Sequence, residues 1–122
     1  MTTKALVAKY MECLFDTGDL DELRKYLADD LRFKGTYFSF DSADEYINGF
    51  EGESFKELSY RILYTFEKDE ACTLIYELIK PSGPLLMSQT FLTERGKITE
   101  ILLIFDGREF SDDTDDEDEW NL

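Results

Sequence analysis

TFLTERGKITEILLIFD, residues 90–106, decides the expected fold of this chain. Two stretches rich in β-branched and aromatic residues flank Glu94-Arg95-Gly96, a short polar segment of the kind that closes a hairpin. We therefore predict two antiparallel strands over residues 85–93 and 97–105, with Asp106 closing the second.

The region before this hairpin predicts two more strands. Leu58, Tyr60, Ile62, Tyr64 and Phe66 alternate with mostly polar residues, which is the pattern of a half-buried strand. Residues 71–80 are apolar on both faces, and a Pro-Ser-Gly-Pro turn follows at 81–84. We expect Tyr60, Tyr64 and a third tyrosine, Tyr76, to make sheet-packing or dimer contacts.

The N-terminal half predicts three helices. Apolar residues recur every three or four positions over 5–15, and Gly18 follows where a helix commonly ends in a left-handed residue. Asp19 is placed to cap a second, short helix, which Asp29-Asp30 should end before a strand over residues 31–34. Ser42 is placed to cap a third helix, over residues 43–50.

Three helices followed by a run of long strands indicate an α+β fold. A ferredoxin-like split arrangement is a minor alternative, but it needs alternating strands and helices, whereas here the strands cluster at the C-terminal end. Residues 1–110 are expected to form one domain, followed by an acidic tail over residues 111–122.

The chain resembles the SnoaL-like branch of the nuclear transport factor 2-like superfamily. Four motifs carry the resemblance, in this order: Gly18-Asp19-Leu20-Asp21, Leu27-Ala28-Asp29-Asp30, Gly96-Lys97-Ile98 and Phe105-Asp106. The resemblance implies a cone in which N-terminal helices pack in a strongly curved antiparallel sheet, as in proteins similar to ketosteroid isomerase. It also implies an apolar pocket and, often, a homodimer built on the outer face of the sheet.

Composition and charge argue against several classes of function. The chain of 122 residues has a formal net charge of −15, and seven of its carboxylates lie within residues 112–119, so nucleic acid is not an expected partner. No apolar run is long enough for a membrane helix, and the first residues lack a secretory signal, so a cytoplasmic location is expected. With no histidine, and with Cys13 and Cys72 as expected buried thiols, we expect neither a metal site nor a cofactor.

The resemblance also marks where catalytic groups would stand. The carboxylate base of the ketosteroid isomerase-like enzymes would correspond to Gly35, or to Lys34 beside it, and their second acid to Gln89 or Ser88. The aspartate base of the SnoaL-like cyclases would correspond to Leu103. These positions carry no acid, so enzymatic activity is uncertain and we lean against it. The remaining candidates for catalysis are Glu77, Gln89 and Tyr10.

We expect a small apolar or aromatic ligand in the cone, with at most weak isomerase- or hydrolase-like chemistry. Alternation in the last strand should turn Thr99, Ile101, Leu103 and Phe105 toward that ligand. The full set of expected ligand contacts is Tyr37, Phe38, Met87, Gln89, Phe91, Ile101, Leu103 and Phe105. The alternative is a non-catalytic homodimeric structural or interaction module whose cone is filled by its own side chains. The volume of the cavity would distinguish the two.

Two expectations concern surfaces. Residues 74–78, 85–87 and 101–104 are apolar on both faces of their strands, which favours a homodimer through the outer face of the sheet. In the acidic tail, Trp120 is the one group large enough to anchor docking in a groove of the same or a neighbouring subunit.

Overall fold

The structure is a computed structural model that describes residues 1–50, 55 and 58–107. The helical elements are α1 (Thr3–Met11), the π-helix η1 (Glu12–Thr17), α2 (Leu20–Lys25) and α3 (Ala43–Asn48). The strands are β1 (Leu27–Lys34), β2 (Ser39–Phe40), β3 (Ser59–Lys68), β4 (Ala71–Lys80), β5 (Gly83–Glu94) and β6 (Lys97–Phe105). The predicted α+β class is confirmed.

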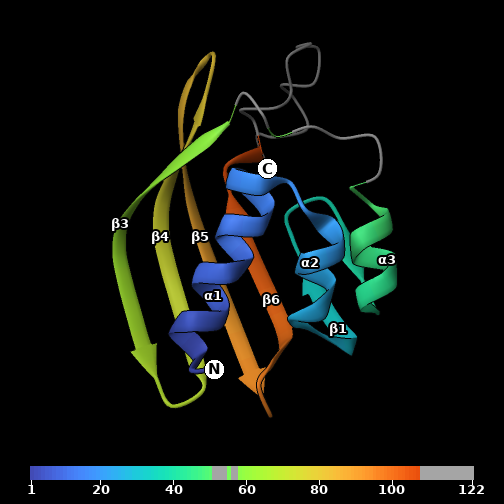
Figure 1. Cartoon of the computed structure of the whole chain (residues 1–122). Helices are drawn as coiled ribbons and strands as arrows, with labels where there is room; N and C mark the ends of the chain where they lie inside the picture. The colour runs from blue at the N-terminus through green and yellow to red at the C-terminus, as the bar shows by residue number, and fades with distance from the viewer. Residues whose placement is uncertain (51–54, 56–57, 108–122) are drawn as a thin grey trace.

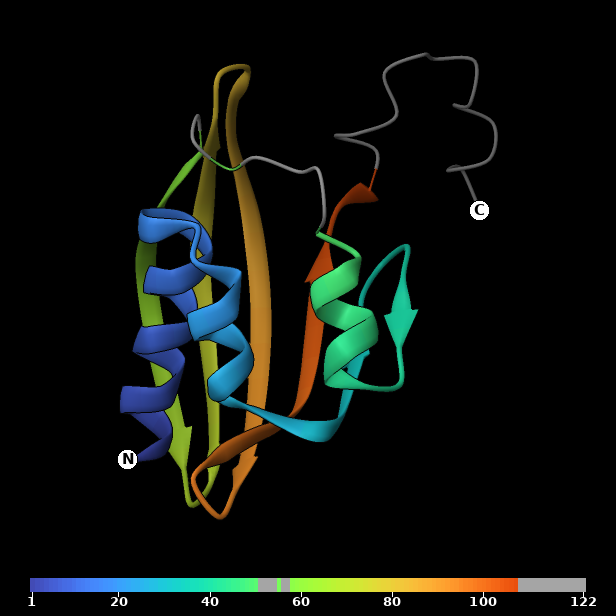
Figure 2. The same ribbon diagram turned by 45° about the vertical axis from the view of Figure 1, so that its right-hand side comes forward.

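The six strands form one curved sheet in the order β2-β1-β6-β5-β4-β3. Neighbouring strands are antiparallel except for β1 and β6, which are parallel. α1 and α2 lie side by side across the concave face, and α3 covers it near β1 (Figures 1 and 2). We call this concave side the inner face and the opposite side the outer face.

Local capping explains where the helices begin. The side chains of Thr2, Asp19 and Ser42 accept hydrogen bonds from backbone N–H groups three residues ahead, at 3.0–3.1 Å. Two of these caps are those predicted for the second and third helices. The first helix continues through η1 to Gly18, whose left-handed backbone, with φ of 69°, ends it as predicted.

The predicted boundary at Asp29-Asp30 is wrong. α2 ends at Lys25, and both aspartates lie inside β1. The parallel pairing of β1 with β6 shifts register between Leu27 and Arg32, and Leu27 and Leu31 are both buried. The aspartates lie in the resulting irregularity with exposed side chains.

The predicted single alternation of β3 is also wrong. Its pairing with β4 shifts between Ile62 and Tyr64, so Leu63 is an extra residue that reverses the alternation. Tyr64 and Phe66 therefore lie on the outer face, whereas Tyr60 and Ile62 lie on the inner one. A bulge of this kind leaves no signal in the hydrophobic pattern of one strand.

The last hairpin is confirmed, with one correction. Arg95 and Gly96 both have left-handed backbones, with φ of 55° and 78°, which is the two-residue turn that suits twisted strands. A register shift beside Leu92 then places Ile98 on the inner face in place of Thr99. The Thr99 hydroxyl instead donates to the Leu92 carbonyl oxygen at 3.2 Å.

The core lies between the helices and the inner face, and its buried apolar residues all fall between Leu6 and Ile101. Cys13 and Cys72 are buried free thiols, as predicted. Within the described part of the chain, no helix is both long and apolar enough to cross a membrane.

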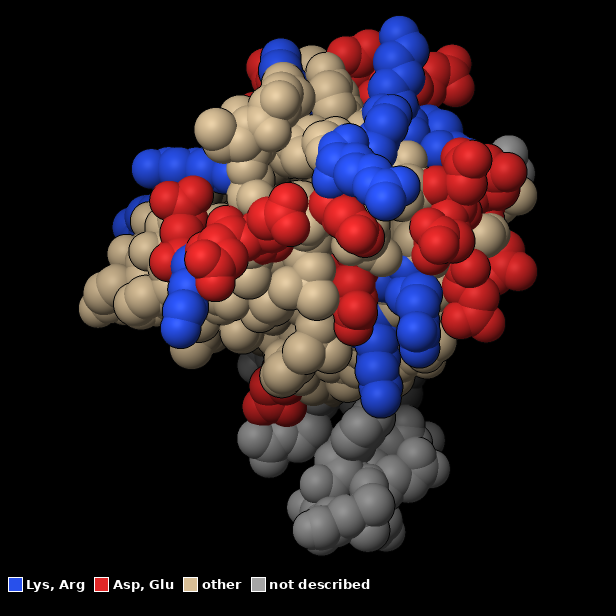
Figure 3. All heavy atoms as spheres, turned by 90° about the horizontal axis from the view of Figure 1, so that it is seen from below, with Lys and Arg blue, Asp and Glu red and all other residues tan. Residues whose placement is uncertain are grey.

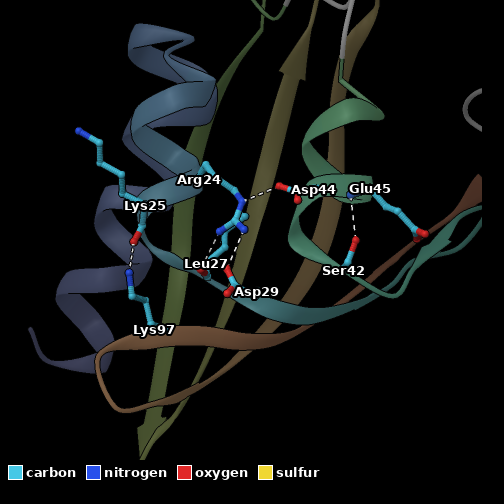
Figure 4. A network of polar contacts seen from close by, with 8 residues as sticks. All are labelled: Arg24, Lys25, Leu27, Asp29, Ser42, Asp44, Glu45 and Lys97. Carbon is cyan, nitrogen blue, oxygen red and sulfur yellow. Dashed lines mark hydrogen bonds and ion pairs between the residues drawn. The ribbon is translucent and has the colours of Figure 1, made fainter.

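Arg24 fastens α2 to its neighbours (Figure 4). Its guanidinium donates to the Leu27 carbonyl oxygen at 3.2 Å, to Asp29 at 2.8 Å and to Asp44 of α3 at 2.9 Å. The hydrogen bond from Arg24 lowers the pKa of the Asp29 carboxyl. One side chain thus joins α2 to β1 and to α3.

Candidate functional site

Four polar side chains from four elements meet inside the cone, and we call them the interior cluster. Tyr10 comes from α1, Tyr46 from α3, Tyr76 from β4 and Gln89 from β5. Each is at most 2% exposed. Buried polar groups need hydrogen-bond partners, so these side chains must satisfy one another or a bound molecule.

The interior cluster is one chain of hydrogen bonds. The Tyr76 hydroxyl donates to Oε1 of Gln89 at 2.7 Å. Nε2 of Gln89 donates to the Tyr10 hydroxyl at 3.0 Å, and the Tyr10 and Tyr46 hydroxyls contact each other. These hydrogen bonds therefore join α1, the sheet and α3 through the middle of the core.

The interior cluster has more hydrogen-bond donors than acceptors. Only one proton can lie between the Tyr10 and Tyr46 oxygens, so the second phenol proton has no acceptor among the described residues. Gln89 keeps one amide hydrogen unused as well. If the Gln89 amide is turned over, so that its oxygen and nitrogen exchange places, the phenol proton without an acceptor is that of Tyr76 instead. Two donors are thus uncommitted in either orientation.

Electrostatics keep these phenols neutral. Burial raises the pKa of Tyr10, Tyr46 and Tyr76, because the dry interior disfavours the phenolate. No described carboxylate is hydrogen-bonded to the interior cluster. The cluster can therefore donate hydrogen bonds, but it holds no group suited to removing a proton at neutral pH.

Aromatic rings surround the interior cluster. Starting at Tyr46, ring centroids succeed one another at 4.9 Å to Phe50, 5.6 Å to Phe55 and 5.8 Å to Phe15. From Phe15 the series continues at 5.2 Å to Tyr60 and 6.4 Å to Tyr76. We call Phe15, Phe50, Phe55 and Tyr60 the aromatic rim; they are half-buried. Aromatic rings and a few polar groups are the side-chain types that line sites for small apolar molecules.

Of the three candidates for catalysis, the fold brings two together. Tyr10 and Gln89 are directly hydrogen-bonded, whereas Glu77 lies on the outer face and forms an ion pair with Arg61. Sequence reasoning missed the roles of Tyr46 and Tyr76 in the cluster. Tyr76 shares its alternation with buried Leu74 and Leu78, a signal that could have placed it inside.

The expected ligand contacts separate into two groups. Met87, Phe91 and Ile101 are buried on the inner face, and Leu103 and Phe105 are half-buried beside them. The Phe91 ring packs edge-on against Tyr10, with centroids 4.9 Å apart.

Tyr37 and Phe38 lie at the edge of this group, in the loop between β1 and β2, and are 43% and 66% exposed. The Tyr37 ring is edge-on to Phe105, with centroids 6.0 Å apart. The Tyr37 hydroxyl donates to the Gly107 carbonyl oxygen at 2.6 Å.

A hollow of about 630 Å³ at the end of the molecule that contains the β5–β6 turn is a weaker candidate. Its charged lining residues are Arg24, Lys25, Asp29, Asp30, Glu94, Arg95 and Lys97. Both signs of charge are interspersed at this end (Figure 3), and Arg24 is already paired. The Lys97 ammonium donates to the Lys25 carbonyl oxygen at 2.6 Å. These contacts are structural, and the hollow presents no single sign of charge to a ligand.

Several solved structures have a fold similar to that of this chain. A nuclear transport factor 2-like protein of unknown function from Cytophaga hutchinsonii superposes with a TM-score of 0.78 at 24% identity, over 92% of this chain and 96% of that one. The chain has the nuclear transport factor 2-like fold. The predicted cone is thereby confirmed.

Two further solved structures of this fold are similar. A candidate ketosteroid isomerase from Kribbella flavida matches with a TM-score of 0.74 at 17% identity, over 84% of this chain and 76% of that one. A SnoaL-like family protein from Agrobacterium tumefaciens matches with a TM-score of 0.67 at 13% identity, over 86% and 97%. No protein-family model and no curated protein matches the sequence. At these identities the likeness establishes the fold alone.

Proposed function

We propose that the cone binds a small, uncharged, apolar or aromatic molecule that carries a hydrogen-bond acceptor such as a carbonyl oxygen. The observation that carries this proposal is the pair of uncommitted donors in the interior cluster, a phenol proton and an amide hydrogen of Gln89. A buried donor without an acceptor costs about 1–3 kcal/mol, so an acceptor that reaches it gains that much.

The surroundings restrict the ligand further. The half-buried Leu103 and Phe105, with the half-buried aromatic rim, retain apolar surface that a ligand could cover, at about 25 cal/mol per Å². A charged ligand would lose its hydration without meeting a counter-charge in the interior cluster, so a neutral molecule fits better.

The same arrangement supports at most weak chemistry. Donors aimed at a carbonyl oxygen stabilise negative charge that develops there, which is one half of an isomerase-like mechanism. The other half is a base, and Glu77 lies on the outer face. We therefore assign the cone a binding role, with polarisation of a carbonyl as the most it contributes to a reaction.

Native mass spectrometry of the freshly purified protein tests this proposal. We expect a retained neutral molecule that contains oxygen and leaves on denaturation. The alternative is a non-catalytic module whose cone is filled by its own side chains, and the complete burial of Phe91 favours it. A protein that carries no molecule and takes up no apolar carbonyl compound would support that alternative.

We further propose that the outer face is an interface between two copies of the chain. Tyr64, Phe66 and Ile104 are 56–61% exposed there. Strand pairing places Tyr64, Ile75, Ser88 and Ile104 in one row across the sheet. A contiguous apolar surface on a soluble chain is typical of a protein contact.

Sedimentation of the wild type and of Tyr64→Glu tests the interface. We expect a dimer at micromolar concentration that the variant dissociates. A wild-type monomer at that concentration would contradict the proposal.

A further inference from the structure

A groove lies on the outer face at the end where β6 finishes. Its volume is about 500 Å³, within the range of sites for small organic groups. Leu86 and Ile104, 59% and 56% exposed, stand on either side. Ser88 lies between Ile75 and Ile104 in the strand pairing, so a short side chain forms the floor between longer ones.

The chain leaves the sheet beside this groove. Phe105 and Asp106 line it, and the sequence continues from there through residues 108–122. Residues 111–122 contain two large apolar side chains, Trp120 and Leu122, behind seven carboxylates. A random coil as long as the sequence from Gly107 to Trp120 would have a root-mean-square span of roughly 20 Å. The groove is therefore within easy reach, at an effective concentration in the millimolar range.

We infer that Trp120 docks in this groove of its own chain and there competes with a second copy for Leu86 and Ile104. Docking removes roughly 150–250 Å² of aromatic surface from water. It also holds the acidic run beside the outer face, where repulsion acts over about 8 Å at physiological salt. The competition between Trp120 and a second copy rests on the proposed dimer interface. The docking of Trp120 in the groove does not.

Fluorescence tests the docking directly, because Trp120 is the only tryptophan in the chain. In the full-length protein, at concentrations below those at which it dimerises, we expect blue-shifted emission and weak quenching by acrylamide. Ile104→Ser should shift the emission toward that of a solvated indole and raise the quenching constant severalfold. Leu92→Ser is the matched control, since Leu92 lies on the same face but outside the groove and is 37% exposed.

Three results would overturn the docking. One is solvent-like emission in the wild type, and another is an equal response to both serine substitutions. The third is a blue shift that appears only at high protein concentration, which would place Trp120 on a second copy.

The competition has a separate test in the full-length Trp120→Ser variant. Its dimer should dissociate at a severalfold lower concentration than that of the wild type, and an unchanged dissociation constant would refute the competition. If wild type and variant are both monomers, the proposed interface fails and the competition with it, while the fluorescence still decides the docking.

Discussion

Tyr76 donates its phenol proton to Oε1 of Gln89 at 2.7 Å, although the two residues are not opposite each other in the sheet. Met87 is opposite Tyr76, and Leu74 is opposite Gln89, so the contact is diagonal. Diagonal neighbours on one face lie within reach of long side chains. With Oε1 of Gln89 accepting from Tyr76, the Gln89 nitrogen faces Tyr10.

The first prediction separates the two ends of the interior cluster. Tyr76→Phe leaves Oε1 of Gln89 buried without its donor, which should lower the free energy of unfolding by about 2 kcal/mol. Tyr46→Phe leaves the number of unused phenol protons unchanged and should cost about 1 kcal/mol or less. Urea denaturation measures both, with Tyr60→Phe on the aromatic rim as control. Equal losses for Tyr76→Phe and Tyr46→Phe would mean that the hydrogen-bond order is wrong.

The second prediction concerns alkaline pH. Burial raises the folded-state pKa of Tyr10, Tyr46 and Tyr76 above the unfolded value of about 10. With respect to these three tyrosines the folded state then binds more protons, so their contribution to stability is constant below about pH 10 and falls as pH rises above it. Each of these tyrosines should contribute a loss of about 1.4 kcal/mol per pH unit. Unfolding free energies at increasing pH should show a shallower slope in Tyr46→Phe, and an identical slope would count against burial of the cluster.

The third prediction concerns Arg24, which joins α2, β1 and α3. Arg24→Met keeps the aliphatic stem but loses three hydrogen bonds, two of them to exposed carboxylates, so we expect a loss of about 1 kcal/mol. Lys25→Met is the control on the same helix, with its side chain 71% exposed and an expected change near zero. Thermal denaturation of both variants measures the difference. Two equal shifts in melting temperature would indicate that Arg24 does not hold α3 in place.

The fourth prediction concerns the proposed tail over residues 111–122, which lies outside the described residues. Because the buried core residues fall between Leu6 and Ile101, a chain ending at residue 111 should fold. Its loss of stability should be smaller than the 2–5 kcal/mol typical of truncating a buried leucine. Leu23→Ala provides that reference. Circular dichroism and urea denaturation measure both, and a truncated chain without cooperative unfolding would make the tail part of the domain.

Sequence reasoning succeeded where local signals decide the structure. Asp19 and Ser42 marked helix starts, and Arg95 with Gly96 marked the final turn, because caps and turns depend on neighbouring residues. It failed at Leu63 and Thr99, where bulges set by pairing with another strand reverse which face a residue occupies. The parallel pairing of β1 with β6 has the same cause, since it joins segments far apart in the chain.

The candidate site was predictable only in part. Gln89 was found through a position that the family resemblance marks, and Tyr10 was among the remaining candidates. Tyr46 and Tyr76 were not identified as cluster members, because a buried tyrosine in an apolar stripe looks the same in sequence whether its hydroxyl meets a partner or solvent. The hydrogen bonds of the interior cluster require four elements to converge, which no spacing within one element shows.

The most direct test of the central claim compares two ligands that differ in one oxygen. Acetonaphthone carries a carbonyl group that ethylnaphthalene lacks, while both bury a similar apolar surface. Isothermal titration calorimetry should show the ketone binding about tenfold more tightly, equivalent to ~1.4 kcal/mol. The Tyr10→Phe/Tyr46→Phe double variant loses the spare phenol proton but keeps the Gln89 amide as a donor, so it should lose part of that preference. Equal affinity for the two ligands in the wild type, or no binding of either, would contradict the account.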